Sequence, residues 1–179
     1  EELPADYNYV SVQAPMELRA DSYKWFTQKP GVADYDGVTD DLKSSGTRLA
    51  AFIGKATEKF HTQPGKVFLI GFSQGAMMSY EVALRQPKLV GGFAALSGRL
   101  LPVVKSEVKA SDDLKALSVF IGHGTQDRQV AYASAPQAEA TLKSLGLTPQ
   151  LHAYEGMGHS INEAEVMDLA AWLKQSNRQ

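Results

Sequence analysis

The five-residue stretch Gly71-Phe72-Ser73-Gln74-Gly75 contains a serine in a setting that suggests covalent chemistry. It fits the pattern G-x-S-x-G, in which a serine stands at a sharp turn from a strand into a helix. The apolar run 67–70 precedes it and a helix-forming stretch follows. In so tight a turn, side chains two residues before and after the serine would collide, so glycines stand there and the hydroxyl is forced outward. We predict that Ser73 is a nucleophile; the alternative is a tight turn whose serine only caps the helix.

A serine hydroxyl is a weak nucleophile at neutral pH, so it needs a histidine to take its proton and an acid to orient that histidine. For this kind of turn the expected chain order is serine, acid, histidine. The chain has four histidines. His159 follows the last apolar run on a glycine-rich loop, and we predict that it is the base. We expect His61 to be a solvated surface residue, His123 to shape a turn and His152 to be structural.

The acid predicted to orient His159 is Asp127, which follows the apolar run 118–121. Asp127 is also placed to cap a helix near 131, and the two roles are compatible. Glu155 is the second choice, because it lies close to the histidine in sequence but at a strand end. Asp112 and Asp113 lie in a polar stretch that reads as a solvated loop or a helix start.

Short apolar runs alternate with segments of helical period, which is the pattern of a mostly parallel sheet with helices on both faces. No repeat, low-complexity tract or linker divides the chain, so residues 1–179 are expected to form a single α/β domain. The predicted strands are 9–13, 67–71, 92–96, 118–121 and 150–154.

Apolar residues recur at helical spacing in four further segments. We predict a long helix over about 37–60, one that begins at the serine turn and ends before Pro87, and one around 135–145 that Gly146 closes. A last helix should begin near 160–162, where Ser160 or Asn162 can cap it.

Composition excludes several classes of function. The formal net charge is −2 and the 18 Lys and Arg are spread along the chain, so a nucleic-acid partner is not expected. There are no cysteines, which removes disulfides, thiolate metal sites and a cysteine nucleophile. No apolar run is long enough to span a membrane. We expect a soluble, cytoplasmic protein, and a homodimer stays open.

Taken together, these motifs resemble the phospholipase/carboxylesterase family of α/β-hydrolases, which includes bacterial carboxylesterases and acyl-protein thioesterases. The resemblance runs from about Val10 to Trp172, and its landmarks occur in family order: Val12-Gln13-Ala14-Pro15, Trp25-Phe26, Gly71-Phe72-Ser73-Gln74-Gly75, Leu96-Ser97-Gly98, His123-Gly124 followed by Asp127, and Gly158-His159. The resemblance implies Ser73 as nucleophile, Asp127 as orienting acid, His159 as base and the Gln74 backbone N–H as an oxyanion donor. It also implies hydrolysis of carboxylic esters or thioesters without a metal or organic cofactor.

One family landmark has no counterpart in this sequence. The family carries a central strand that ends in a His-Gly loop, which gives the second oxyanion N–H, and nothing before Val10 resembles it. Because that strand belongs between the strand at 9–13 and the strand at 67–71, its absence would leave unpaired backbone groups on both sides. We therefore expect the N-terminal portion of a longer α/β-hydrolase domain to be missing here.

Three functions compete at this stage. The leading one is a carboxylesterase for short to medium acyl chains, and the second is a thioesterase or lysophospholipase. The third is a non-catalytic binding relative with an incomplete oxyanion hole. Trp25, Leu101 and Met157 are the predicted substrate-binding residues, and Phe26, Leu100 and Ile161 also flank the inferred site; each could equally pack the core.

Overall fold

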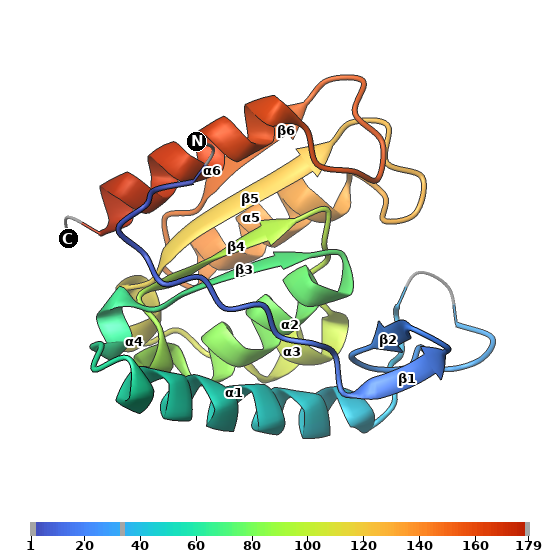
Figure 1. Cartoon of the computed structure of the whole chain (residues 1–179). Helices are drawn as coiled ribbons and strands as arrows, with labels where there is room; N and C mark the ends of the chain where they lie inside the picture. Colours follow the sequence, from blue (N-terminus) through green and yellow to red (C-terminus); the bar gives the residue numbers. More distant parts are fainter. Residues whose placement is uncertain (1–2, 33–34, 178–179) are drawn as a thin grey trace.

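The computed structural model describes residues 3–32 and 35–177. Its centre is a parallel sheet with the strand order β3-β4-β5-β6 (Figure 1). The strands are β3 (Phe68–Phe72), β4 (Gly92–Leu96), β5 (Ser118–Gly124) and β6 (Gln150–Tyr154). Because all four run in the same direction, the loops that follow them meet at one edge of the sheet.

Helices cover both faces of this sheet, as the sequence pattern predicts (Figure 1). On one face lies α6 (Glu163–Ser176), which buries Leu169, Trp172 and Leu173 against β4 and β5. On the other face lie α2 (Gln74–Arg85) and α5 (Ser134–Ser144), and α1 (Asp41–Lys59) packs against α2. Shorter elements are α3 (Pro102–Glu107), α4 (Asp112–Lys115), η1 (Pro64–Lys66) and η2 (Pro87–Leu89).

The core is densest around β4, every residue of which is buried. Phe93 on this strand packs edge-on against Tyr80 of α2, with ring centroids 5.2 Å apart. On the opposite face, Phe120 of β5 lies 6.0 Å from the Trp172 ring. Burial of one such side chain stabilises a fold by about 1.5–3 kcal/mol, so both faces contribute to fixing the strands whose ends carry the candidate site.

The predicted strands at 92–96 and 150–154 are confirmed with their bounds, and β3 is shifted by one residue from its predicted range. β5 is longer than predicted. Gly122, His123 and Gly124 continue its pairing with β6, and two glycines and a histidine carry too weak a strand signal to be included from sequence. All four predicted helices are present, and the Asn162 side chain caps α6 by accepting a hydrogen bond from the backbone N–H of Glu165.

The strand predicted at 9–13 is wrong: this segment forms no strand. Tyr9, Val10 and Val12 are exposed, and a groove of about 720 Å³ lies between this segment and β3. Without a neighbouring backbone at hydrogen-bonding distance, an extended apolar segment has no ladder to join.

An unexpected antiparallel hairpin follows that segment. It consists of β1 (Met16–Arg19) and β2 (Ser22–Lys24), and Met16 pairs with Lys24. Its turn contains Asp21 with a φ of 57°, a left-handed conformation that short polar side chains tolerate. The hairpin lies to one side of the main sheet, next to the beginning of α1 (Figure 1).

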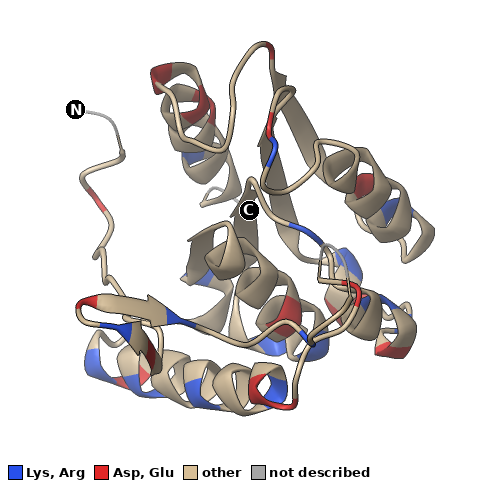
Figure 2. Cartoon of the chain, turned by 90° about the vertical axis from the view of Figure 1, so that its right-hand side faces the viewer, with Lys and Arg blue, Asp and Glu red and all other residues tan. Residues whose placement is uncertain are grey.

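Figure 2 views the molecule towards the carboxyl ends of the strands and shows Lys and Arg interspersed with Asp and Glu along α1 and the loops. Within residues 3–32 and 35–177, no helix has the length and apolar character that crossing a membrane requires.

Candidate active site

The serine turn connects β3 directly to α2. Ser73 has φ 55° and ψ −117°, an uncommon conformation for a residue with a side chain, and its backbone N–H donates to the Leu96 carbonyl at 2.9 Å. Strained residues of this kind persist where the surrounding structure fixes them, often at functional sites. The Ser73 side chain makes no capping hydrogen bond to α2. The alternative in which this serine only caps the helix therefore finds no support.

The two glycines of the motif are needed to different degrees. A Cβ on Gly71 would lie 2.2 Å from the backbone carbonyl group of Gly75, so only glycine fits there. A Cβ on Gly75 would have nothing within 4 Å among the described residues. The expectation that both glycines avoid a collision is therefore right for Gly71 and wrong for Gly75, which borders the open groove beside β3.

Ser73, His159 and Asp127 come together at the carboxyl ends of the strands. His159 Nε2 lies 3.1 Å from Ser73 Oγ, and His159 Nδ1 lies 2.7 Å from Asp127 Oδ2. The serine follows β3, the aspartate follows β5 and the histidine follows β6. With the proton of the imidazole on Nδ1, His159 donates to the carboxylate and accepts from the hydroxyl. The arrangement can pass a proton away from Ser73.

Asp127 is buried, and both of its oxygens are hydrogen-bonded. Oδ1 accepts from the backbone N–H groups of Gln129 at 2.8 Å and Val130 at 2.9 Å, while Oδ2 faces His159. Burial by itself would raise the pKa of Asp127, but the hydrogen bonds from His159, Val130 and Gln129 outweigh it and lower the pKa below its usual value. The side chain is therefore a carboxylate at neutral pH.

Backbone contacts join the loops that carry the acid and the base. The Gln126 N–H donates to the Met157 carbonyl at 2.9 Å, and the Gly156 N–H donates to Thr125 Oγ1 at 3.0 Å. A Cβ on Gly124 would lie 2.2 Å from the same Met157 oxygen, so glycine permits this close approach. Because the loops are bonded to each other, the distance between Asp127 and His159 does not depend on their side chains alone.

Gln74, the residue after the serine, begins α2. Among the described residues its backbone N–H has no hydrogen-bond acceptor, as expected in the first turn of a helix, and it points from the positive end of the helix dipole. The side-chain amide accepts from the Trp25 N–H at 2.9 Å and donates to the Phe26 carbonyl at 3.2 Å. No sequence signal identifies this contact, because the two segments lie far apart in the chain.

The other three histidines and the second candidate acid, Glu155, are not part of the Ser73–His159–Asp127 arrangement. His61 is exposed after α1, and His152 on β6 lies 3.2 Å from Asp168. Glu155, the second choice for the acid, is exposed and makes no contact with His159. His123 is fully buried on β5, close to Asp127. No group of three or more metal-ligating side chains occurs within the described parts of the chain.

The three predicted substrate-binding residues lie in different surroundings. Trp25 lines the groove beside β3. Met157 is buried on the loop that precedes His159. Leu101 has no exposed surface and belongs to the main core, so in this structure it offers no contact to a substrate.

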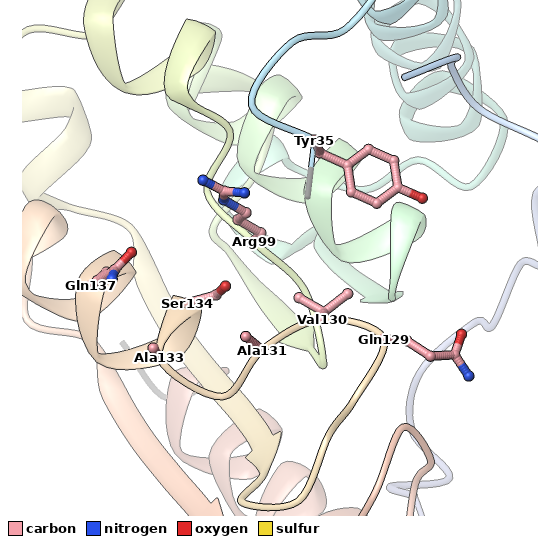
Figure 3. A pocket seen from close by; sticks show the side chains of 8 residues that line it. All are labelled: Tyr35, Arg99, Gln129, Val130, Ala131, Ala133, Ser134 and Gln137. Atoms are coloured by element: carbon pink, nitrogen blue, oxygen red, sulfur yellow. The ribbon is translucent and has the colours of Figure 1, made fainter. Parts of the chain in front are cut away.

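A smaller cavity of about 160 Å³, lined by polar and apolar side chains alike, lies between the segment after β4 and the beginning of α5 (Figure 3). Arg99 and Tyr35 border one side, and the loop from Gln129 to Ser134 borders the other. Arg99 also pairs with Asp36. Sequence reasoning did not anticipate this cavity.

The parallel sheet, the serine at the β3–α2 turn, and the acid and histidine on later loops define an α/β-hydrolase fold. The chain belongs to the phospholipase/carboxylesterase family, whose model matches residues 5–177. The resemblance noted in the sequence is thereby confirmed.

The proteins similar to this chain include carboxylesterases and acyl-protein thioesterases. Carboxylesterase SOBER1 of Arabidopsis thaliana is 36% identical over 114 residues, which are 63% of this chain and 50% of that protein. Acyl-protein thioesterase 1 of Candida albicans is 31% identical over 131 residues, 70% of this chain and 56% of that protein. The crystal structure of Arabidopsis thaliana SOBER1 superimposes with a TM-score of 0.72 at 29% identity and covers 86% of this chain and 73% of that one. The chain spans about half the length of the curated relatives it matches.

Proposed function

We propose that this protein hydrolyses carboxylic esters of short to medium acyl chains, with Ser73 as nucleophile, His159 as general base and Asp127 as the orienting acid. The observation that supports this most directly is the unbroken line of contacts, 3.1 Å from Ser73 Oγ to His159 Nε2 and 2.7 Å from His159 Nδ1 to Asp127 Oδ2. Three side chains far apart in sequence meet in the order that acyl transfer requires.

The proposed reaction has two steps. His159 Nε2 takes the Ser73 proton while Ser73 Oγ attacks the ester carbonyl carbon, and the imidazolium then protonates the leaving alcohol. A water molecule, deprotonated by the same histidine, attacks the acyl-enzyme, and the carboxylic acid leaves as Ser73 regains its proton. Asp127 stabilises the imidazolium in both steps, which requires the carboxylate form that its lowered pKa provides.

The backbone N–H of Gln74 is the proposed donor to the oxyanion of each tetrahedral intermediate. Loss of one such donor typically costs on the order of 10²–10³ in rate, so a second donor matters. We propose that it comes from a strand beside β3 that residues 1–179 do not include. In support, β3 has no strand partner besides β4 within residues 3–32 and 35–177, Ile70 is 41% exposed, and a groove of about 720 Å³ runs along this edge.

Thioester hydrolysis is the second candidate, because the same attack on an acyl carbon releases a thiol in place of an alcohol. It is favoured by the similarity to acyl-protein thioesterase 1 of Candida albicans. A series of p-nitrophenyl esters of increasing acyl length, with a palmitoyl thioester as comparison, separates the two. We expect the highest kcat/KM with short or medium esters.

Ser73→Ala is the decisive variant. We expect a fluorophosphonate probe to label the wild-type chain at Ser73 and to leave the variant unlabelled, with a loss of ester hydrolysis on the order of 10³-fold or more. Ser106→Ala, which changes an exposed helix serine, is the matched control. Because the second oxyanion donor is proposed to lie outside residues 1–179, labelling decides: a folded wild-type chain whose Ser73 does not react with the probe would contradict the proposal and favour a non-catalytic binding role.

A further inference from the structure

His123 is a second imidazole beside the carboxylate of Asp127. Its Nε2 atom lies 2.9 Å from the Val130 carbonyl oxygen and 3.3 Å from Asp127 Oδ2. Both side chains are completely buried. Since His159 also contacts Oδ2, two histidines, one on β5 and one on the loop after β6, lie against this one oxygen atom.

The surroundings of His123 determine where its proton lies. Nε2 faces two acceptors, the Val130 carbonyl and the Asp127 carboxylate, so it has to carry a hydrogen. Nδ1 is buried and has no hydrogen-bond partner among the described residues. A proton there would be a buried donor without an acceptor, which is costly. The contacts therefore place a hydrogen on Nε2 of His123.

This hydrogen completes a closed set of bonds around the carboxylate. The Val130 N–H donates to Asp127 Oδ1, the Val130 carbonyl accepts from His123, and His123 also faces Asp127 Oδ2. His123 is a residue of β5, which is paired on both sides within the sheet. The acid loop is thus tied to an interior strand of the sheet from a side that His159 does not occupy.

We propose that His123 is a positioning residue for the reaction: by donating to the Val130 carbonyl it fixes the acid loop, and its ring, with Nε2 3.3 Å from Asp127 Oδ2, keeps that oxygen at the place where His159 Nδ1 must bind. The inference rests on the proposed function. Without His123 the carboxylate would keep the two backbone donors on Oδ1, but its second oxygen would be free to turn, and His159 would lose its fixed orientation towards Ser73.

Two amide substitutions at position 123 distinguish a hydrogen-bond donor at the place of Nε2 from a side chain that is only polar. In His123→Gln the amide nitrogen reaches approximately the place of Nε2, whereas in His123→Asn it stays near the place of Nδ1 and reaches neither acceptor. With a short p-nitrophenyl ester we expect kcat of His123→Asn to fall by about threefold to tenfold, since the loss of the hydrogen bond that fixes the acid loop is worth about that factor. KM should stay within about twofold, and His123→Gln should recover most of kcat. Equal kcat for the two variants would overturn the proposal.

Proton and nitrogen NMR give a readout that does not require turnover. Without the His123 ring the carboxylate is free to turn and its hydrogen bond with His159 weakens, so the Nδ1 proton of His159 should move to higher field in His123→Asn and stay in place in His123→Gln. A resonance unchanged in His123→Asn would overturn the proposal.

If His123→Asn does not fold, the ¹⁵N shifts of the wild-type imidazole decide the question: a hydrogen on Nδ1 of His123 contradicts the assignment, and one on Nε2 supports it. A wild-type chain whose Ser73 does not react with the fluorophosphonate probe would refute the proposed function, while these shifts would still test the inference about His123.

Discussion

The acid–base side of the candidate site and its nucleophile side are held in different ways. Asp127 and His159 follow β5 and β6, on loops bonded to each other, and the aspartate has hydrogen-bond partners on both oxygens. Ser73 follows β3, whose other edge borders an open groove. The comparison shows that the geometry of acid and base is fixed within the described residues, whereas the surroundings of the nucleophile are open on one side.

Asp127→Asn is expected to have the largest effect, because it acts on the fixed side. The asparagine oxygen can still accept from Gln129 and Val130, but its NH₂ group would face His159 Nδ1. The imidazole would then have to present a lone pair there and carry its hydrogen on Nε2, towards Ser73. We expect kcat to fall on the order of 10³–10⁴-fold with little change in Tm.

Asp113→Asn, at an exposed position, is the control for that measurement. Steady-state hydrolysis of one ester by the three proteins tests the prediction. An Asp127→Asn chain within tenfold of wild type would show that this carboxylate does not orient the base.

The two glycines of the serine turn test how tightly the nucleophile side is packed. A Cβ at Gly71 would meet the Gly75 backbone at 2.2 Å, whereas a Cβ at Gly75 would point into open space. We expect Gly71→Ala to lower the free energy of unfolding by about 2–4 kcal/mol and Gly75→Ala to change it by less than about 1 kcal/mol. Urea denaturation measures both variants. Equal losses of unfolding free energy would mean that a Cβ at Gly75 meets as close a neighbour as a Cβ at Gly71.

Glu165 packs against Gly122 of β5, the strand that leads to Asp127, and the pH dependence of stability tests its state. Its side chain is buried against Gly122, and neither carboxylate oxygen has a partner among the described residues. Burial raises its pKa to about 7 from a usual value of 4.5. Between these values the folded state binds more protons than the unfolded one, so stability falls as pH rises through this window and the loss is complete above about pH 7.

Glu165→Gln removes that titration. Relative to wild type, we expect the variant to gain up to about 3 kcal/mol in unfolding free energy between pH 4.5 and pH 8, with the gain largest above pH 7. Glu163→Gln, exposed in the same helix turn, should show no such trend. A difference between wild type and Glu165→Gln that stays constant with pH would show that Glu165 does not titrate in this range.

The smallest effect is expected at the open edge of β3. Ile70→Lys places a charge on a strand edge that is already solvent-exposed, so the unfolding free energy should change by no more than about 0.5 kcal/mol. Self-association, measured by sedimentation velocity, should decrease because charged edges resist strand pairing. Met167→Lys removes a comparably exposed apolar side chain on α6 and should leave association unchanged.

Most of the sheet and the three residues of the proposed triad could be predicted from sequence, because each depends on a local signal. Ser73 stands in a recognisable turn motif, Asp127 follows an apolar strand, and His159 stands on a glycine-rich loop before the last helix. The prediction of a strand at 9–13 was wrong because it depended on a distant partner and not on a local signal. Its residues have strand propensity, but a strand forms only where a partner backbone lies beside it.

The sequence by itself determined the four strands of the main sheet, the four longest helices, the serine turn and the residues capable of acyl chemistry, since these follow from periodicity and from contacts between near neighbours. Only the tertiary structure decided that His123 shares the Asp127 carboxylate with His159 and that the Gln74 side chain holds the backbone at Trp25. It also decided that Gly75 faces open space. These contacts join segments from different strands and loops, and their distances are set by how the sheet packs, which no local pattern of residues records.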